Sequence, residues 1–137
     1  MEKSKRAPKD TSNGIVFKRE EDFYSGYANN TLFEGTIWDL KIYFGQTDIA
    51  QGANVVVQHT AITLPWNYAK IFSYLLQTQI AAREAEDGRI PVPKHIVPTP
   101  PTAMPTEFSA HLKHPKEGIE AIQKLWQAFV AANPELE

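Results

Sequence analysis

Four histidines are the side chains of this sequence with the widest range of chemistry at neutral pH: His59, His95, His111 and His114. His111 and His114 are three residues apart, and Pro115 follows them as the expected first residue of a helix. The two rings therefore need not share a helix face, no acidic residue stands at zincin spacing, and the chain contains no cysteine. The pattern favours packing or surface roles, and we expect no metal site.

The other nucleophiles and acids also lack a catalytic pattern. No serine occupies a G-x-S-x-G turn, and no glycine-rich phosphate loop is present. The acidic clusters at 20–22 and 84–87 stand beside basic residues, as on a solvated edge. An enzyme is the third hypothesis, and a deep pocket where His59, Tyr43 and a buried carboxylate converge would support it. Nothing in the sequence predicts one, so we expect a non-enzymatic protein without a cofactor.

Aromatic residues gather between 24 and 43, where a sheet face could stack bases: Tyr24, Tyr27, Phe33, Trp38 and Tyr43. A stacking platform needs interleaved cations, yet Lys41 is the only basic residue between Phe23 and Thr63. Cations gather instead in residues 1–13, at Lys3, Lys5, Arg6 and Lys9. Single-stranded nucleic-acid binding through this arm and the aromatic face is therefore the second hypothesis.

Composition limits the cellular setting. The net charge is −2, so there is no general attraction to phosphate backbones. The basic start is not followed by an apolar stretch, and no run approaches the roughly 20 apolar residues of a membrane span. We expect a cytoplasmic protein that does not bind membranes.

Three segments are predicted to form strands. The aromatic and polar run 23–33, ended by Glu34-Gly35, predicts the first. Apolar residues alternate with others over 40–45, and the β-branched run 55–64 is typical of a third strand that pairs with the second as a hairpin.

Two helices are predicted after the strands. Pro65 opens the first and Gly88 ends it, and its apolar stripe has helical spacing: Tyr68, Ile71, Phe72, Leu75, Leu76 and Ile80. Six of the fifteen residues in 91–105 are proline, which predicts a semi-rigid spacer. Pro115 opens the second helix, which ends near Asn133-Pro134 and has its own apolar side: Ile119, Ile122, Trp126, Phe129 and Val130.

Two stretches, Tyr24 to Gln46 and Val57 to Asp87, resemble a family of short bacterial proteins known as domain of unknown function 3467. The likeness lies in a tyrosine-led strand with an Asn-rich stretch, a second strand ending in an aromatic, and a strand leading into a helix with the pair Ala69-Lys70. Here Leu64-Pro65-Trp66 replaces the usual Ser or Thr before proline. The resemblance covers about residues 24–87 and implies a fold without an assigned activity.

The sequence thus predicts an α+β protein with an antiparallel sheet of three or more strands covered by one long helix. We expect a flexible arm at 1–13, a core domain at 14–90, a proline-rich spacer at 91–113 and an amphipathic helix at 114–134. So small a sheet favours completion by a second copy. The leading hypothesis is an oligomeric protein-interaction or assembly module that binds a protein partner through the apolar residues 119, 122, 126, 129 and 130, or through a sheet edge.

Overall fold

The computed structural model of the 137-residue chain describes residues 14–48, 50, 54–97, 102 and 112–136. Three strands come first: β1 (Asn30–Gly35), β2 (Asp39–Thr47) and β3 (Val56–Pro65). They are followed by helix α1 (Trp66–Asp87), the short 3-10 helix η2 (Lys94–Ile96), helix α3 (Pro115–Ala132) and the 3-10 turn η3 (Pro134–Leu136). The expected α+β fold, with two later helices, is confirmed.

The sheet is antiparallel with the order β1-β2-β3, so β2 is central and the other two strands are edges. In the register, Phe33 of β1, Ile42 of β2 and Ile62 of β3 lie opposite one another and hence on one face. Leu40 and Leu64 pair on the same face. This apolar face is the side of the sheet on which a core can form.

The first strand begins later than predicted. The aromatic run from Phe23 indicated a strand over 23–33, but β1 covers Asn30–Gly35, including the Glu34-Gly35 pair expected to end it. Cross-strand pairing explains the difference, because the β1–β2 ladder runs from Asn30 opposite Gly45 to Gly35 opposite Leu40. β-Propensity marks residues that suit a strand, whereas the register decides which of them pair.

A compact turn joins β1 to β2. The Thr36 hydroxyl donates to Asp39 Oδ1 at 2.9 Å and accepts from the backbone N–H groups of Trp38 and Asp39, both at 3.1 Å. The Thr36 N–H also donates to the Asp39 carbonyl oxygen at 2.8 Å. Thr36 and Asp39 therefore fix the turn locally, and residues 37 and 38 form its tip.

A bulge between Phe44 and Gly45 interrupts the β2–β3 register, so that Phe44 lies opposite Thr60 and Gly45 opposite Gln58. Glycine is required there, because a Cβ on residue 45 would stand 2.6 Å from the Val57 carbonyl oxygen.

β3 runs straight into α1 at Pro65, whose φ of −64° and ψ of 150° are extended. The Trp66 indole N–H donates to the Thr36 carbonyl oxygen at 2.8 Å and ties the start of α1 to the β1–β2 turn. At the other end Gly88, with φ 85°, donates its N–H to the Glu84 carbonyl oxygen at 2.9 Å. The positive φ explains why glycine ends this helix, as predicted.

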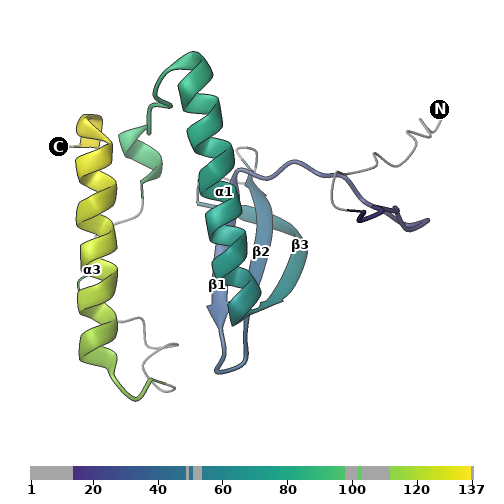
Figure 1. Ribbon diagram of the computed structural model, residues 1–137, viewed down its shortest axis with the longest axis horizontal. Helices are drawn as coiled ribbons and strands as arrows, with labels where there is room; N and C mark the ends of the chain where they lie inside the picture. Colours follow the sequence, from purple (N-terminus) through teal and green to yellow (C-terminus); the bar gives the residue numbers. More distant parts are fainter. Residues whose placement is uncertain (1–13, 49, 51–53, 98–101, 103–111, 137) are drawn as a thin grey trace.

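Figure 1 shows α1 lying along the sheet, with its C-terminal part extending past the strands. α3 stands to the side with η2 between the two helices, and the C-terminus lies at the end of α3 near η2. Only part of the length of α1 therefore lies against the sheet. The boundaries 14–90, 91–113 and 114–134 stay predictions, and the arm 1–13 lies outside the described residues.

Candidate functional site

His59 borders a shallow hollow of about 170 Å³ between β3 and the segment before β1, lined by Tyr24, Gly26, Ala28, Phe44, His59 and Thr60. The His59 Nε2–H donates to the Tyr27 carbonyl oxygen at 2.8 Å, and in the neutral ring Nδ1 then accepts from the Thr60 hydroxyl, also at 2.8 Å. The Tyr24 ring lies 5.9 Å from the His59 ring, tilted by 60°. These contacts give His59 the role of holding residues 24–28 against the sheet.

Tyr43 and a buried carboxylate do not converge on His59 around this hollow. Its lining includes no carboxylate and no Tyr43. The Tyr43 hydroxyl instead donates to Glu34 Oε2 at 3.2 Å across the β1–β2 pair. Its volume is also below the roughly 300–1,000 Å³ of ordinary ligand pockets. The three groups of the enzyme hypothesis are therefore not brought together at this hollow, and the expectation of a non-enzymatic protein stays a prediction.

The other histidines do not assemble a metal site in the part of the chain that the structure describes. His114 Nδ1 lies 4.0 Å from Glu117 Oε1 at the start of α3. No group of three or more potential ligands is present among the described residues. His111 lies outside the described residues, so the predicted absence of a site there stays a prediction.

Exposed apolar surface is the most prominent feature of the described residues. Ile42, at 3% exposure, is the only hydrophobic side chain among them that is buried. Large exposed hydrophobic residues occur before the sheet, on the edge strands β1 and β3, at the β1–β2 turn and on both long helices. Monomeric proteins seldom expose contiguous apolar patches of more than a few hundred Å². The described fold thus contains much less core than its apolar content could build.

The total surface leads to the same conclusion. The chain exposes 12178 Å², whereas a folded monomer of 15.4 kDa exposes roughly 7,200 Å². The 31 residues outside the described ranges can be assigned the surface area of unfolded chain. The surface area left for the described residues still exceeds that of a folded monomer of the same mass by roughly 1,000 Å². A typical protein–protein interface covers about 800 Å² on each partner. The excess is therefore large enough to hold a complete interface.

Helix α1 carries a large share of this surface. Its whole predicted stripe, which we call the α1 stripe, is between 38% and 51% exposed: Tyr68, Ile71, Phe72, Leu75, Leu76 and Ile80. The sequence predicted the stripe and a helix that covers the sheet, and α1 does contact β2 and β3, yet the stripe stays about half exposed. Helical spacing shows which residues share a face, and it cannot show that the sheet is too small to cover that face.

The predicted partner-binding residues of α3 are less exposed than the α1 stripe. Ile119, Ile122, Trp126 and Val130 are half-buried, and Phe129 is 39% exposed. The Trp126 and Phe129 rings are 6.1 Å apart. Leu125, which lies off the predicted stripe, is 72% exposed. The structure brings the five residues together on one helix side, and whether they bind a partner stays a prediction.

The tip of the β1–β2 turn was missed by sequence reasoning. Ile37 is 63% exposed and Trp38 is 77% exposed, although both are strongly apolar. A signal was present, since an Ile-Trp pair between Thr36 and Asp39 stands where turns usually place polar residues.

The basic residues of the nucleic-acid hypothesis, Lys3, Lys5, Arg6 and Lys9, lie outside the described residues.

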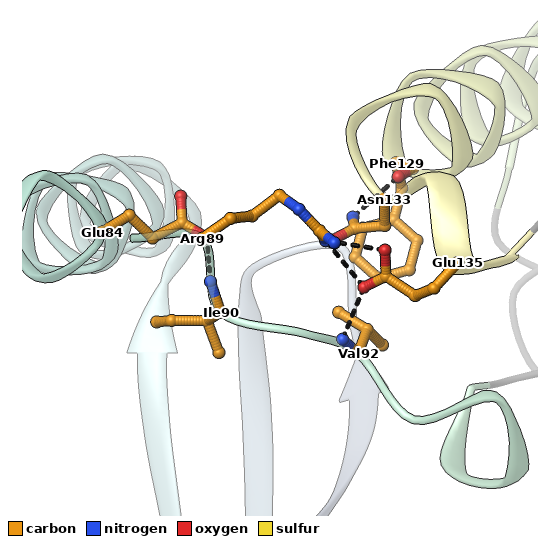
Figure 2. Close-up of polar contacts among 7 residues, drawn as sticks. All are labelled: Glu84, Arg89, Ile90, Val92, Phe129, Asn133 and Glu135. Atoms are coloured by element: carbon orange, nitrogen blue, oxygen red, sulfur yellow. Dashed lines mark hydrogen bonds and ion pairs between the residues drawn. The ribbon is translucent and has the colours of Figure 1, made fainter. Parts of the chain in front are cut away.

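One ion pair joins the end of the chain to the segment after α1 (Figure 2). Arg89 Nη1 donates to Glu135 Oε1 at 2.7 Å and lies 2.6 Å from Oε2. The Val92 N–H donates to the same Oε1 at 2.7 Å, and the Ile90 N–H donates to Glu84 Oε1 at 2.9 Å. The hydrogen bond from Arg89, with that from Val92, lowers the pKa of Glu135 to about 2.

The same contact raises the pKa of Arg89, chiefly through the hydrogen bond to Glu135. Near Glu135, the Asn133 side-chain N–H donates to the Phe129 carbonyl oxygen at 2.8 Å and ends α3. The arrangement is a structural anchor for the C-terminal segment, because Glu135 Oε1 accepts from both the Arg89 guanidinium and the Val92 N–H.

None of the described helices is both long and apolar enough to cross a lipid bilayer.

In comparisons with known proteins, no family model matches the chain, and no curated protein or solved structure is significantly similar to it. The resemblance to domain of unknown function 3467 therefore stays a prediction from the residues quoted for it.

Proposed function

We propose that this protein is a non-enzymatic interaction module that works as an assembly of several chains. The observation that supports the proposal is the near absence of a core, with Ile42 the only buried hydrophobic side chain among the described residues. Leaving so much apolar surface in water is unfavourable by about 25 cal/mol per Å². Contact with another polypeptide removes that cost and adds the core that the small sheet lacks.

The topology also favours assembly. A three-stranded sheet has two edges, and both β1 and β3 are edge strands here. β1 is exposed along almost its whole length. Unpaired edges and uncovered apolar faces are the two features by which small β-containing units associate.

Multi-angle light scattering of the intact chain, at micromolar to hundred-micromolar concentration, tests the proposal. The expected mass is a multiple of the 15.4 kDa of one chain, with a concentration-dependent melting temperature. A mass of one chain at all concentrations, with a cooperative and concentration-independent transition, would falsify the assembly.

A further inference from the structure

The α1 stripe has the properties of an interface with a second copy of the same helix. Its six side chains run along one side of α1 and remain 38% to 51% exposed. At roughly 200 Å² for each fully exposed large side chain, they present roughly 550 Å² of apolar surface. With a polar rim, that surface approaches the 800 Å² that each partner of a stable complex contributes.

The charged residues of α1 are placed unfavourably for its helix dipole, because the acidic ones lie near its C-terminal end. Its first turn has no acidic residue, and Pro65 at the N-cap makes no side-chain hydrogen bond there. The neutral Asn67 Oδ1 accepts the Tyr68 N–H at 2.8 Å, so no negative charge faces this end of the helix. The other end contains Glu84, Glu86 and Asp87, while its last turn has no basic residue. An α-helix is stabilised by negative charge at its start and positive charge at its end. A second helix running in the opposite direction would supply the missing negative charge.

Glu86 is the acidic residue placed to do this. Glu84 already accepts the Ile90 N–H, and Asp87 pairs with Arg83 at 2.7 Å. Glu86 comes eighteen residues after Tyr68, which is about five turns of α-helix, so it continues the side on which the α1 stripe begins. In an antiparallel pair, Glu86 of each chain therefore faces the first turn of the other, which lacks an acidic residue, and its Tyr68 hydroxyl.

We propose that two copies of this chain pair through the α1 stripe, with the helices antiparallel and Glu86 of each copy beside Tyr68 and the first turn of the other. The arrangement is a twofold-symmetric interface, in which every contact occurs twice. It rests on the proposed function, because it names the partner and the surface of that assembly. The partner is a second copy rather than another protein, because α1 itself provides the apolar stripe, a first turn without acidic residues and an acidic C-terminal end that complements it.

A matched pair of leucines tests the surface. Leu76 of α1 is 51% exposed and Leu125 of α3 is 72% exposed, so either accepts a charge without loss of the monomer fold, which circular dichroism checks. Leu76→Glu is expected to lower the light-scattering mass from twice 15.4 kDa to that of one chain, and Leu125→Glu to leave it unchanged. The opposite result, or no effect of Leu76→Glu, overturns the α1 interface while the assembly itself stands.

Thiol cross-linking tests the orientation, since the chain has no cysteine of its own. With a short bifunctional maleimide, the double variant Tyr68→Cys, Glu86→Cys is expected to form a covalent dimer, and each single variant to remain uncross-linked. Covalent dimers from both single variants would indicate parallel helices and overturn the proposal. A dimeric mass without any cross-link would place the interface elsewhere, and a monomeric wild-type chain would overturn the proposed function as well.

A charge variant that leaves the apolar stripe intact gives an independent test. Glu86→Lys is expected to raise the dimer dissociation constant roughly tenfold, since two symmetric charge–dipole contacts are lost. Glu120→Lys, an exposed position on α3, is the matched control and is expected to change the constant less than twofold. Equal effects of the two variants would contradict a role for Glu86.

Discussion

Arg89 and Glu135, separated by 46 positions in the sequence, hold the C-terminal turn against the segment after α1 through a contact of 2.7 Å between Nη1 and Oε1. Figure 2 shows the guanidinium and the Val92 N–H converging on the same carboxylate. Between Val97 and Leu112 only Thr102 is described, so this contact and the hydrogen bond from the Val92 N–H connect the described C-terminal segment to the segment after α1.

The first prediction concerns the pH dependence of that link. The folded pKa of Glu135 is about 2, below its ordinary value of 4.5. The carboxylate therefore contributes stability that is fully present above about pH 5 and is lost as the pH falls through 4.5 towards 2. A carbon-13 NMR titration of the Glu135 carboxyl is expected to have its midpoint near pH 2.

Arg89→Gln provides the control for this titration, because Arg89 is the largest cause of the lowered pKa. The midpoint is expected to rise towards 4.5, by less than the full difference because the Val92 N–H remains. A midpoint near 4.5 in the unaltered chain would show that the ion pair does not form in solution.

A second prediction follows from the tie between Trp66 and Thr36. Trp66→Phe keeps an aromatic ring but removes the indole N–H that donates to the Thr36 carbonyl oxygen. The expected loss is about 1 kcal/mol in the free energy of unfolding, measured by urea denaturation at fixed protein concentration. Trp38→Phe is the matched control, and because Trp38 is 77% exposed, a change within about 0.5 kcal/mol is expected. Equal losses for both would argue against the hydrogen bond.

Gly45 carries the third prediction. A Cβ at this position would lie 2.6 Å from the Val57 carbonyl oxygen, which is backbone and cannot rotate away. Gly45→Ala is expected to destabilise the chain by about 1–3 kcal/mol. At Gly26 the nearest obstacle is the end of the Tyr24 side chain, so Gly26→Ala should cost less. If thermal unfolding ranks the two variants the other way, the bulge in solution differs from the one described.

Local sequence patterns predicted most of the strands and helices. The features that could not be predicted are those that depend on residues far apart in the sequence. Alternation over 40–45 identified β2, and Pro65 and Gly88 marked the ends of α1, because each signal acts within a few residues. The start of β1 depends on pairing with β2, so the aromatic run from Phe23 suggested a strand that begins too early.

For the candidate interaction surface, the sequence predicted which residues share a helix face but not how exposed that face is. Spacing identified both amphipathic helices, yet it could not show that the α1 stripe would be the more exposed of the two. That outcome depends on sheet size and on where α3 stands. The ion pair of Arg89 with Glu135 could not be predicted either, because neither residue has a sequence neighbour that marks it as one half of a pair.

The last prediction decides between protein assembly and the nucleic-acid hypothesis. The described sheet has Lys41 close to an aromatic ring, with its Nζ 5.8 Å from the Tyr43 ring centre, and one such cation gives little attraction to a phosphate backbone. We therefore expect no fluorescence-anisotropy change with labelled single-stranded DNA, even at low salt. A salt-dependent change that disappears when Lys3, Lys5, Arg6 and Lys9 are all replaced by Gln would instead support nucleic-acid binding through residues 1–13. The same quadruple variant should keep the light-scattering mass of the wild type, because the α1 stripe is unaltered.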